Sequence, residues 1–445
     1  MSILVRFAPS PTGLLHAGNA RTAVMNYLFA HANGGKFLLR IDDTDQGRSK
    51  KEFEDAILLD LAWLGVHHDV FTRQSAREER YDAAVKKLKE SGKLYPCYET
   101  QDELERKRKR QQARHRPPVY DRAALKLSND DCEALEANGR SPHWRFLLSR
   151  TNVAWDDLIR GPVEIDTANV SDPVLIRADG TYLYTLPSVV DDLELAVSHV
   201  VRGEDHVTNS AVQVEIFQAL GVAPPCFAHH PLLVGAKAEA LSKRLGSLSL
   251  RRMREDGVES LALATYLAKI GTSDAIEPKA SISELSSEFD FGKIGRAPAR
   301  FDQVELGALN AKLLHRLEYE EVCKKLAALD CDMGPEFWEA VRTNIGKMSD
   351  VAEFKALVAG PVSPVIEDVE MLEKALELLP EEPFTLETWG AWTKVVSATT
   401  GRKGRGLFHP LRLALTGQEN GPELAKLLPL IGRVRAMARL KGETA

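Results

Sequence analysis

The start of the chain alternates between short apolar runs and longer amphipathic patterns, and this alternation restricts the fold more than any other feature. The stretches "ILVRFA" (3–8) and "KFLLRID" (36–42) predict strands, whereas the patterns over 17–32 and 52–64 predict helices. A strand–helix–strand–helix order is typical of a doubly wound sheet of parallel strands. We therefore expect an α/β domain at the beginning of the chain.

A different pattern interrupts this α/β region. A highly charged helical stretch over 100–116 ends at two consecutive prolines, and the strand-like stretches "HWRFLL", "VAWDDLI", "GPVEID" and "PVLIRADGTYLYTL" follow it. This order predicts an α+β insertion. A strand over 196–205 and a helix over 208–220 then resume the α/β alternation, and the sequence is mostly helical from about residue 260 onward.

Length and composition restrict the class of protein. A chain of 445 residues is long enough for two to four domains. No run approaches about 18 consecutive apolar residues, and the first residues lack the pattern of a signal peptide, so we expect no membrane span and no secretion. The five cysteines form no C-x-x-C pair, which favours a reducing cytosol over a disulfide framework. Because the formal net charge is −6, a nucleic-acid partner would have to meet local basic patches.

The turn "APSPTGLLHAG" joins the first strand to the first helix, where open α/β sheets bind ligands and helix N-termini favour anions. Gly13 and Gly18 have the spacing of a phosphate-binding P-loop, but Asn19 and Ala20 stand where that loop requires lysine and serine or threonine. His16 therefore either supplies charge to a bound phosphate or caps the helix. Taken alone, the histidine favours the capping role.

A second motif far along the chain changes that balance. The stretch "EALSKRLGSLS" (239–249) is by itself more typical of a surface loop. Together with the opening turn, however, it resembles the HIGH and KMSKS signatures of class I aminoacyl-tRNA synthetases. Five stretches are similar, in this order, to segments of the bacterial glutamyl-tRNA synthetases: "RFAPSPTG", "RIDDTDQGRS", "YTLPSVVDDLELAVSHVVRGEDH", "LSKR" and "GLFHPLRLALTGQENGPEL". The resemblance covers nearly the whole chain.

The resemblance implies a Rossmann-like class I catalytic domain with an α+β insertion, followed by an all-α anticodon-binding region. We expect the first half of the catalytic domain over 1–99, an acceptor-end-binding insertion over 100–181 and the second half over 182–235. A stem-contact region with the LSKR loop is expected over 236–315, and the helical anticodon-binding region over 316–445.

The implied reaction has two steps in a cytoplasmic, monomeric enzyme. L-glutamate attacks the α-phosphate of ATP, and the 3′-adenosine of tRNA(Glu) then takes the glutamyl group. Whether tRNA(Gln) is also an acceptor is left open by the sequence. Mg²⁺ is expected to accompany ATP, held largely by phosphates and water. We expect no structural zinc and no protein metal ligand, because Glu99 follows Cys97 at the C-x-C spacing that some relatives use for zinc. Cys97 is more typical of a buried apolar side chain.

His16 and Lys243 are implied to stabilise charge on the phosphates in the transition state, and Gly18 to permit close approach of the backbone. Ala240 stands where the KMSKS motif usually begins with lysine, which leaves a regulatory or non-catalytic tRNA-binding paralogue as an alternative. The residues expected to contact ATP or assist its reaction are His16, Gly18, Glu204, Asp205, Leu241, Ser242, Lys243 and Arg244.

Glutamate carries two carboxylates and one ammonium, so a selective pocket needs arginine for the former and an acid for the latter. Asp42 is expected to meet the ammonium together with Ser10, although the family usually has glutamate at that position, and Ser188 replaces a common asparagine. For one isolated arginine, an ion pair at the sheet edge with Asp42, Asp43 or Glu204 is favoured, but two arginines with these acids inside the matched motifs favour a glutamate pocket. The expected glutamate-binding residues are Arg6, Ala8, Ser10, Asp42, Tyr184, Ser188 and Arg202.

Basic stretches predict contacts with tRNA. The densest one, 106–116, is equally compatible with a solvated charged helix. The stretch "TTGRKGRGLFHPLR" mixes glycine, basic and aromatic residues, which suits unstacked anticodon bases. The expected tRNA-binding residues are Arg108, Arg110, Arg251, Lys347, Arg402, Lys403 and Arg412.

Two related enzymes remain as alternatives. A glutamyl-queuosine-type relative that modifies a tRNA base would lack the helical C-terminal region. A glutaminyl enzyme would be expected to carry β-barrels there, and the sequence has almost no strand-like alternation in its last hundred residues.

Overall fold

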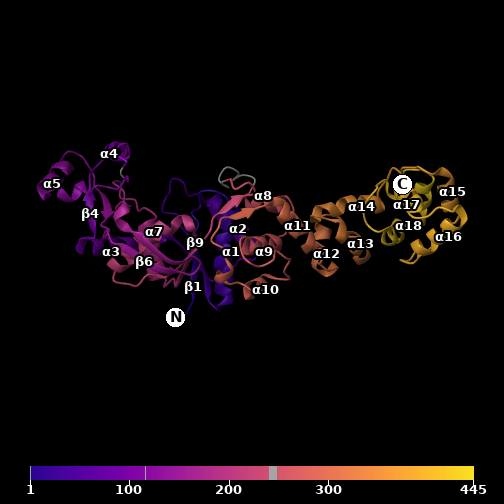
Figure 1. Ribbon diagram of the computed structural model, residues 1–445, viewed down its shortest axis with the longest axis horizontal. Coiled ribbons are helices and arrows are strands. Elements are labelled where there is room, and N and C mark those ends of the chain that lie inside the picture. The colour runs from indigo at the N-terminus through magenta and orange to yellow at the C-terminus, as the bar shows by residue number, and fades with distance from the viewer. Residues whose placement is uncertain (1, 116, 240–247) are drawn as a thin grey trace. The chain divides into compact units, whose positions relative to one another are not determined.

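The computed structural model describes residues 2–115, 117–239 and 248–445 (Figure 1). The chain divides into two compact units. Unit 1 comprises Met1–Asp256 and Leu263–Asp302, and unit 2 comprises Gly257–Ala262 and Gln303–Ala445. Among the described helices, none has the length and apolar character needed to cross a membrane.

A seven-stranded sheet with the order β3-β2-β1-β9-β10-β6-β7 forms the centre of unit 1. All neighbouring strands are parallel except β6 and β7, so the predicted doubly wound parallel sheet is confirmed. Val5 pairs with His199, and this register joins the two predicted halves. The strands are β1 (Leu4–Phe7), β2 (Lys36–Ile41), β3 (Val70–Arg73), β6 (Asn152–Asp157), β7 (Gly161–Asp166), β9 (His199–Gly203) and β10 (Cys226–His230).

Helices accompany the strands of this sheet in sequence, as the alternation predicted. Helix α1 is buried on most sides and is rich in alanine, the residue with the highest helix propensity. Its buried Arg21 donates from Nη1 to the Pro231 carbonyl and from Nη2 to the Ile270 carbonyl, whereas its Nε has no partner among the described residues. The helices are α1 (Ala17–Ala32), α2 (Lys51–Trp63), α3 (Glu78–Glu90), α6 (Thr185–Glu194) and α7 (Val207–Ala219).

A separate three-stranded sheet, order β4-β5-β8, lies between the two halves in sequence. Its strands pair antiparallel, and the helices α4 and α5 both begin at a capping box, formed by Thr100 with Glu103 and by Ser128 with Asp131. These elements are β4 (Leu94–Cys97), α4 (Gln101–Ala113), α5 (Asn129–Ala137), β5 (His143–Phe146) and β8 (Val174–Ile176).

The hairpin β6–β7 differs from the sequence expectation, which assigned both strands to the insertion. In the structure β6 joins the large sheet through β10, with Phe227 opposite Asp157. The alternating burial of β7 fits a strand with one solvent-exposed face. Such a hairpin is compatible with either sheet, so the sequence pattern could not assign it.

Unit 1 ends with three short helices and a two-stranded parallel sheet. Its remaining elements are β11 (Leu233–Gly235), α8 (Leu250–Glu255), α9 (Ser260–Lys269), α10 (Ile282–Ser287) and β12 (Ala299–Phe301), with the first three residues of α9 assigned to unit 2.

Unit 2 is helical throughout its described elements, in agreement with the sequence prediction. A continuous apolar core contains the fully buried rings of Trp338 and Trp392. Gly432, with φ of 77°, interrupts the last helix with a conformation that favours glycine. The helices are α11 (Gln303–Leu314), α12 (Tyr319–Ala328), α13 (Pro335–Val341), α14 (Val351–Ala359), α15 (Val369–Glu377), α16 (Thr388–Thr400), α17 (Arg405–Thr416) and α18 (Leu424–Leu440).

Candidate functional site

The candidate site lies where the strand order reverses, between β1 and β9. The strands that follow β1 in sequence extend the sheet to one side, and β9 and β10 extend it to the other. Ligands of open α/β sheets bind at the carboxyl ends of strands at such a switch point. Arg6 of β1 and Arg202 of β9 lie at those ends, and both are buried, at 5% and 6% exposure.

His16 performs the capping role that the sequence left open. It is the N-cap of α1, and its Nδ1 accepts a hydrogen bond from the Gly18 backbone N–H at 3.1 Å. A Cβ added at Gly18 would lie 3.0 Å from the imidazole ring, so the ring packs tightly against this glycine. Burial lowers the pKa of His16, which favours a neutral ring. A contact with phosphate remains a prediction.

The opening turn is joined by its backbone to the segment that follows the second motif. Ala17 N–H donates to Leu248 O at 3.1 Å, and Leu250 N–H donates to Leu15 O at 3.0 Å. This antiparallel bridge places His16 opposite Ser249. The predicted residues of the motif lie outside the described residues: Ala240, Leu241, Ser242, Lys243 and Arg244. The bridge therefore fixes the downstream end of that motif beside His16.

Arg6 belongs to a buried charge cluster centred on Arg40. Arg6 Nε and Arg40 Nη1 both donate to Asp192, at 3.2 and 2.8 Å. Arg40 also donates to both oxygens of Asp42, from Nε at 2.7 Å and from Nη2 at 3.1 Å. Arg40 is fully buried and was missed by the sequence reasoning. Arg6 pairs with Asp192, which is not one of the three acids that the sequence suggested for such an ion pair.

A third carboxylate, Asp191, completes this cluster. It accepts from Arg77 at 2.6 Å, from Gln74 at 3.0 Å and from the Tyr81 hydroxyl at 3.0 Å. Burial raises the pKa of the Tyr81 hydroxyl, and the adjacent Asp191 raises it further, so Tyr81 stays a donor. The cluster thus joins three guanidinium groups to three carboxylates: Arg6, Arg40 and Arg77 with Asp42, Asp191 and Asp192.

Asp42 and Ser188, two of the predicted glutamate-binding residues, contact the same guanidinium. Arg40 Nη2 donates to Ser188 Oγ at 3.1 Å as well as to Asp42. Burial raises the pKa of Asp42 to about 6, and Arg40 opposes that shift. The Asp42 backbone N–H donates to Pro9 O at 3.0 Å, which places Asp42 beside the exposed Ser10. The structure thus brings the predicted ammonium-binding residues together.

Arg202 differs from Arg6 because its described hydrogen-bond partners are all neutral. Nη1 donates to the Tyr184 hydroxyl at 3.0 Å, and Nη2 donates to Ser210 Oγ and Gln213 Oε1 at 2.6 Å each. Nε points to His229 Nε2 at 3.4 Å. No carboxylate of the residues described here lies within 4.0 Å of the guanidinium, although the side chain is buried. Burial lowers the pKa of Arg202, and the charge of Arg6 adds to this shift while Tyr184 and Asp192 oppose it. A buried, unpaired cation of this kind is a strong attractor for an anion.

The expected nucleotide-binding acids follow β9 in a 3₁₀ turn, Glu204–His206. Glu204 pairs with Arg160 at 2.5 Å and accepts from the Leu232 N–H at 3.3 Å, whereas the Asp205 side chain is exposed. Glu204 is therefore already engaged with protein groups. Asp205 is the more accessible of the two acids.

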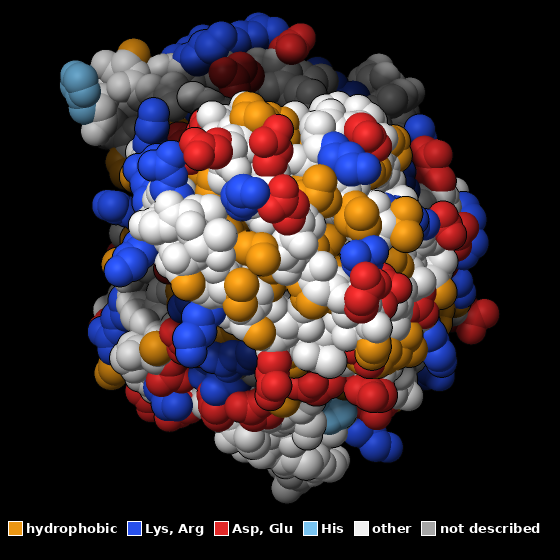
Figure 2. All heavy atoms as spheres, turned by 90° about the vertical axis from the view of Figure 1, so that its right-hand side faces the viewer, with side chains coloured by type: hydrophobic (Ala, Val, Ile, Leu, Met, Phe, Trp, Pro, Cys, Tyr) orange, Lys and Arg blue, Asp and Glu red, His pale blue; other side chains and the backbone are white. Residues whose placement is uncertain are grey.

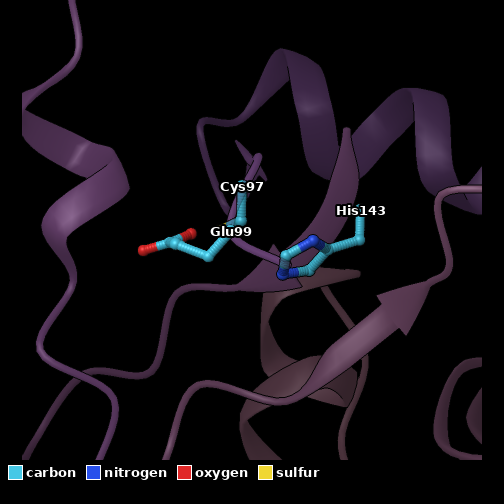
Figure 3. Close-up of side chains that lie close together, drawn as sticks. All are labelled: Cys97, Glu99 and His143. Carbon is cyan, nitrogen blue, oxygen red and sulfur yellow. The ribbon is translucent and has the colours of Figure 1, made fainter. Parts of the chain in front are cut away.

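Cys97, Glu99 and His143 form a cluster of potential metal ligands in the small sheet, with their ligand atoms within 4.8 Å of one another (Figure 3). The sequence reasoning missed His143, which is brought opposite Cys97 by the pairing of β4 with β5. Burial raises the pKa of the Cys97 thiol to about 12, and Lys107 Nζ already lies 3.1 Å from Glu99 Oε1. Structural zinc is almost always held by four ligands, at least two of them cysteine, so this set of three described donors with one thiol fits structural zinc poorly. The absence of structural zinc remains a prediction.

The predicted tRNA contacts fall into two groups. Most are exposed: Arg108 and Arg110 on α4, Arg251 on α8, and Lys347, Arg402 and Lys403 in unit 2. Arg402 pairs with Asp368 at 2.9 Å, and the half-buried Arg412 donates to Pro422 O at 2.9 Å. Figure 2 shows one face of the protein, on which basic and acidic side chains lie interspersed among apolar ones. This face therefore carries no uniform positive field.

Comparisons with known proteins agree with this geometry. A family model described as "tRNA synthetases class I (E and Q), catalytic domain" matches residues 2–307, and an "Anticodon binding domain" model matches residues 337–443. The chain is 56% identical to "Glutamate--tRNA ligase 2" of Methylorubrum populi, with 100% of this chain and 99% of the relative covered. It is also 56% identical to "Glutamate--tRNA ligase 1" of Parvibaculum lavamentivorans, with 99% of each covered. A crystal structure of a glutamate tRNA ligase from Elizabethkingia meningosepticum, in complex with its amino acid, superposes with a TM-score of 0.87 at 27% identity, covering 99% of both chains.

Proposed function

The chain belongs to the class I tRNA synthetases for glutamate and glutamine, and on that premise we propose how its residues carry out the reaction. It is a glutamyl-tRNA synthetase, an ATP-dependent ligase that acts on glutamate and tRNA. A regulatory paralogue and a base-modifying relative are not favoured, because curated glutamate–tRNA ligases match the full length of the chain. The roles of individual residues are the subject of the proposal.

The buried Arg202 is the observation that supports the proposed glutamate pocket. A guanidinium with only neutral partners gains a charge-assisted pair when a carboxylate arrives, whereas glutamine would bring an amide. The α-carboxylate loses its charge when it forms the adenylate. The side-chain carboxylate keeps its charge through both steps, so it suits a permanent partner better. We therefore assign the side-chain carboxylate to Arg202 and the α-carboxylate to Arg6, with the ammonium near Asp42.

The phosphate chemistry is assigned to the two signature motifs. In-line displacement at phosphorus needs positioning and charge stabilisation, not a covalent nucleophile. His16 donates to the phosphates through Nε2 while its Nδ1 is held by Gly18 N–H. Lys243 supplies positive charge from the LSKR loop, assisted by Ser242 and Arg244. Mg²⁺ accompanies ATP, and Asp205 binds the ribose hydroxyls.

Unit 2 is proposed as the part of the chain that reads the anticodon. Its match to an anticodon-binding model and its exposed basic residues Arg402 and Lys403 support this role. The proposal includes tRNA(Glu) as the acceptor with tRNA(Gln) as a further one, and a monomer that works in the cytoplasm. The five free cysteines are consistent with that compartment.

Aminoacylation assays test the glutamate pocket. Purified enzyme is given tRNA(Glu) and tRNA(Gln) separately, with glutamate or glutamine as the amino acid. Arg202→Met keeps most of the buried volume and removes the charge. Loss of one partner of a buried charge pair costs on the order of 2–5 kcal/mol, so KM for glutamate should rise about 30-fold or more while KM for ATP stays unchanged.

Arg145→Met is the matched control. Arg145 is also buried, donates to the Asp172 carbonyl at 2.7 Å, and lies in the small sheet of the insertion. Its replacement should leave KM for glutamate unaltered. Wild-type discrimination between glutamate and glutamine in a folded Arg202→Met protein would refute the assignment of Arg202.

A further inference from the structure

A chain of buried hydrogen bonds leads from Arg202 to a carboxylate on another strand. Asp157, at the end of β6, holds His229 of β10 through a contact of 2.5 Å between Oδ2 and Nδ1. Its other oxygen, Oδ1, accepts the backbone N–H groups of Ile159 at 3.1 Å, Arg160 at 3.0 Å and His229 at 3.1 Å. Neither side chain has any exposed surface. The carboxylate is therefore fixed in position by four hydrogen bonds.

This arrangement determines which nitrogen of His229 carries the proton. Burial acts to raise the pKa of Asp157, but the bonds from His229 and the backbone outweigh it and lower that pKa to about 2. An ionised carboxylate only accepts, so His229 Nδ1 must be the donor. Burial lowers the pKa of His229 and keeps the ring neutral, which leaves a lone pair on Nε2.

The lone pair on His229 Nε2 sets the direction of the remaining bonds. Ser210 Oγ lies 2.8 Å from it and 3.2 Å from the His206 carbonyl oxygen, and we assign the hydroxyl proton to the shorter contact, with Nε2; the same oxygen accepts from Arg202 Nη2 at 2.6 Å. Arg202 Nε also points at His229 Nε2, at 3.4 Å. Along the shorter contacts, donors and acceptors alternate from the guanidinium through Ser210 and His229 to Asp157. These hydrogen bonds fix the Nε and Nη2 side of Arg202, while Nη1 has Tyr184 as its only partner among the described residues.

We infer that Asp157, His229 and Ser210 are positioning residues that orient Arg202 for its carboxylate and thereby set selectivity for glutamate over glutamine. The inference rests on the proposed role of Arg202. None of the three residues needs to touch the substrate, because they act through the guanidinium. The negative charge of Asp157 reaches Arg202 only through neutral groups, so Arg202 is held in place without an ion pair and keeps its attraction for the ligand.

Asp157→Asn tests the inference with a change of one atom. The three backbone N–H groups keep the asparagine Oδ1, so its NH₂ group faces His229 Nδ1 and reverses the tautomer. His229 Nε2 then becomes a donor that opposes Arg202 Nε. KM for glutamate should rise by about 10- to 100-fold, the scale of losing a partner that orients a binding group. The preference for glutamate over glutamine should fall in parallel, with KM for ATP unchanged.

Asp172→Asn provides the matched control. Asp172 is equally buried and accepts from Arg122, Tyr95 and the Leu148 N–H, but it lies in the insertion. Its replacement should lower stability and leave KM for glutamate unaltered. If the role of Asp157 were merely structural, Asp157→Asn would behave like Asp172→Asn: the amount of folded enzyme would fall, and its KM for glutamate would stay normal.

If Asp157→Asn fails to fold, Ser210→Ala tests whether these residues orient Arg202. Removing this one hydroxyl should raise KM for glutamate about three- to tenfold, the value of one hydrogen bond. If the folded variants keep wild-type KM and selectivity while Arg202→Met loses both, the positioning chain is refuted and the role of Arg202 stands. If Arg202→Met also keeps the wild-type KM for glutamate and the wild-type selectivity, the proposed role of Arg202 is refuted, and the inference about Asp157, His229 and Ser210 is refuted with it.

Discussion

Asp192→Ala should destabilise unit 1 far more than the removal of an exposed acid. The Asp192 carboxylate is 4% exposed and accepts from Arg6 at 3.2 Å and from Arg40 at 2.8 Å. Without it, three guanidinium groups of the cluster share two carboxylates, and two of those guanidinium groups lose their common partner. Removing one member of a buried ion pair costs about 3–5 kcal/mol.

The expected shift in melting temperature follows from the size of the unit. Unfolding entropy is about 2.1 cal/mol/K per residue, and unit 1 has roughly 300 residues, which gives about 0.6 kcal/mol/K. A loss of about 3–5 kcal/mol should therefore lower Tm by about 5–8 °C. Asp192→Asn keeps an acceptor oxygen while losing the charge, so its Tm should fall between those of the wild type and the alanine variant.

Calorimetry of the full chain measures this shift in the transition of unit 1. Asp45→Ala is the control, because Asp45 pairs with Arg48 on the surface, at side-chain exposures of 34% and 74%. An exposed pair contributes less than about 1 kcal/mol, so the control should move Tm by under about 2 °C. If Asp192→Ala shifts Tm no more than Asp45→Ala, the charges of the cluster do not depend on one another and the reasoning fails.

Four further predictions concern the reaction and its partners. Burial raises the pKa of Asp42 from its ordinary value of 3.8 to about 6, so between those pH values the folded protein holds a proton that the unfolded chain has lost. Tm should therefore fall as pH rises from 4 to 6, and Asp42→Asn should flatten that profile. Lys243→Ala should slow glutamate activation by about 10²–10³-fold in pyrophosphate exchange with tRNA(Glu) present, and near-normal exchange would remove Lys243 from the mechanism. Metal analysis should find no stoichiometric zinc, and one zinc per chain lost together with folding under chelation would contradict the interpretation of Cys97. A chain ending at Leu314 should bind a non-hydrolysable adenylate analogue in calorimetry, yet lose tRNA affinity and its steep salt dependence; full tRNA selectivity would exclude unit 2 as the anticodon reader.

Local patterns predicted the strands β1, β2, β6, β7 and β9, because burial and helix periodicity are properties of neighbouring residues, but they left β3 and β10 unassigned. The helix expected over 17–32 is α1, and the strand expected over 36–42 is β2 with one residue less. The position of the hairpin β6–β7 was not predictable in the same way. Its place in the large sheet depends on a contact between Asp157 and Phe227, which lie 70 residues apart.

The candidate site was predictable only in part. Family motifs pointed to Arg6, Asp42 and Arg202, whose ionic and hydrogen-bond partners come from distant segments. Arg40 gave a signal that went unused: it is a charged residue inside the apolar run "KFLLRI", and such a residue must find a buried partner. The partner itself, Asp192, lies 152 positions further along the chain. No local pattern could connect the two.

The pairing of β1 with β9 has a consequence for synthesis of the chain on the ribosome. The Leu4 N–H donates to Ser198 Oγ at 2.8 Å, and the Ser198 N–H donates to Leu4 O at 2.9 Å, across 194 positions. At about 5–20 residues per second, β1 waits roughly 10–40 s for this neighbour. During that time one edge of the nascent sheet is open to other chains. Translation that stops before residue 198 would therefore release an aggregation-prone fragment instead of a partly functional enzyme.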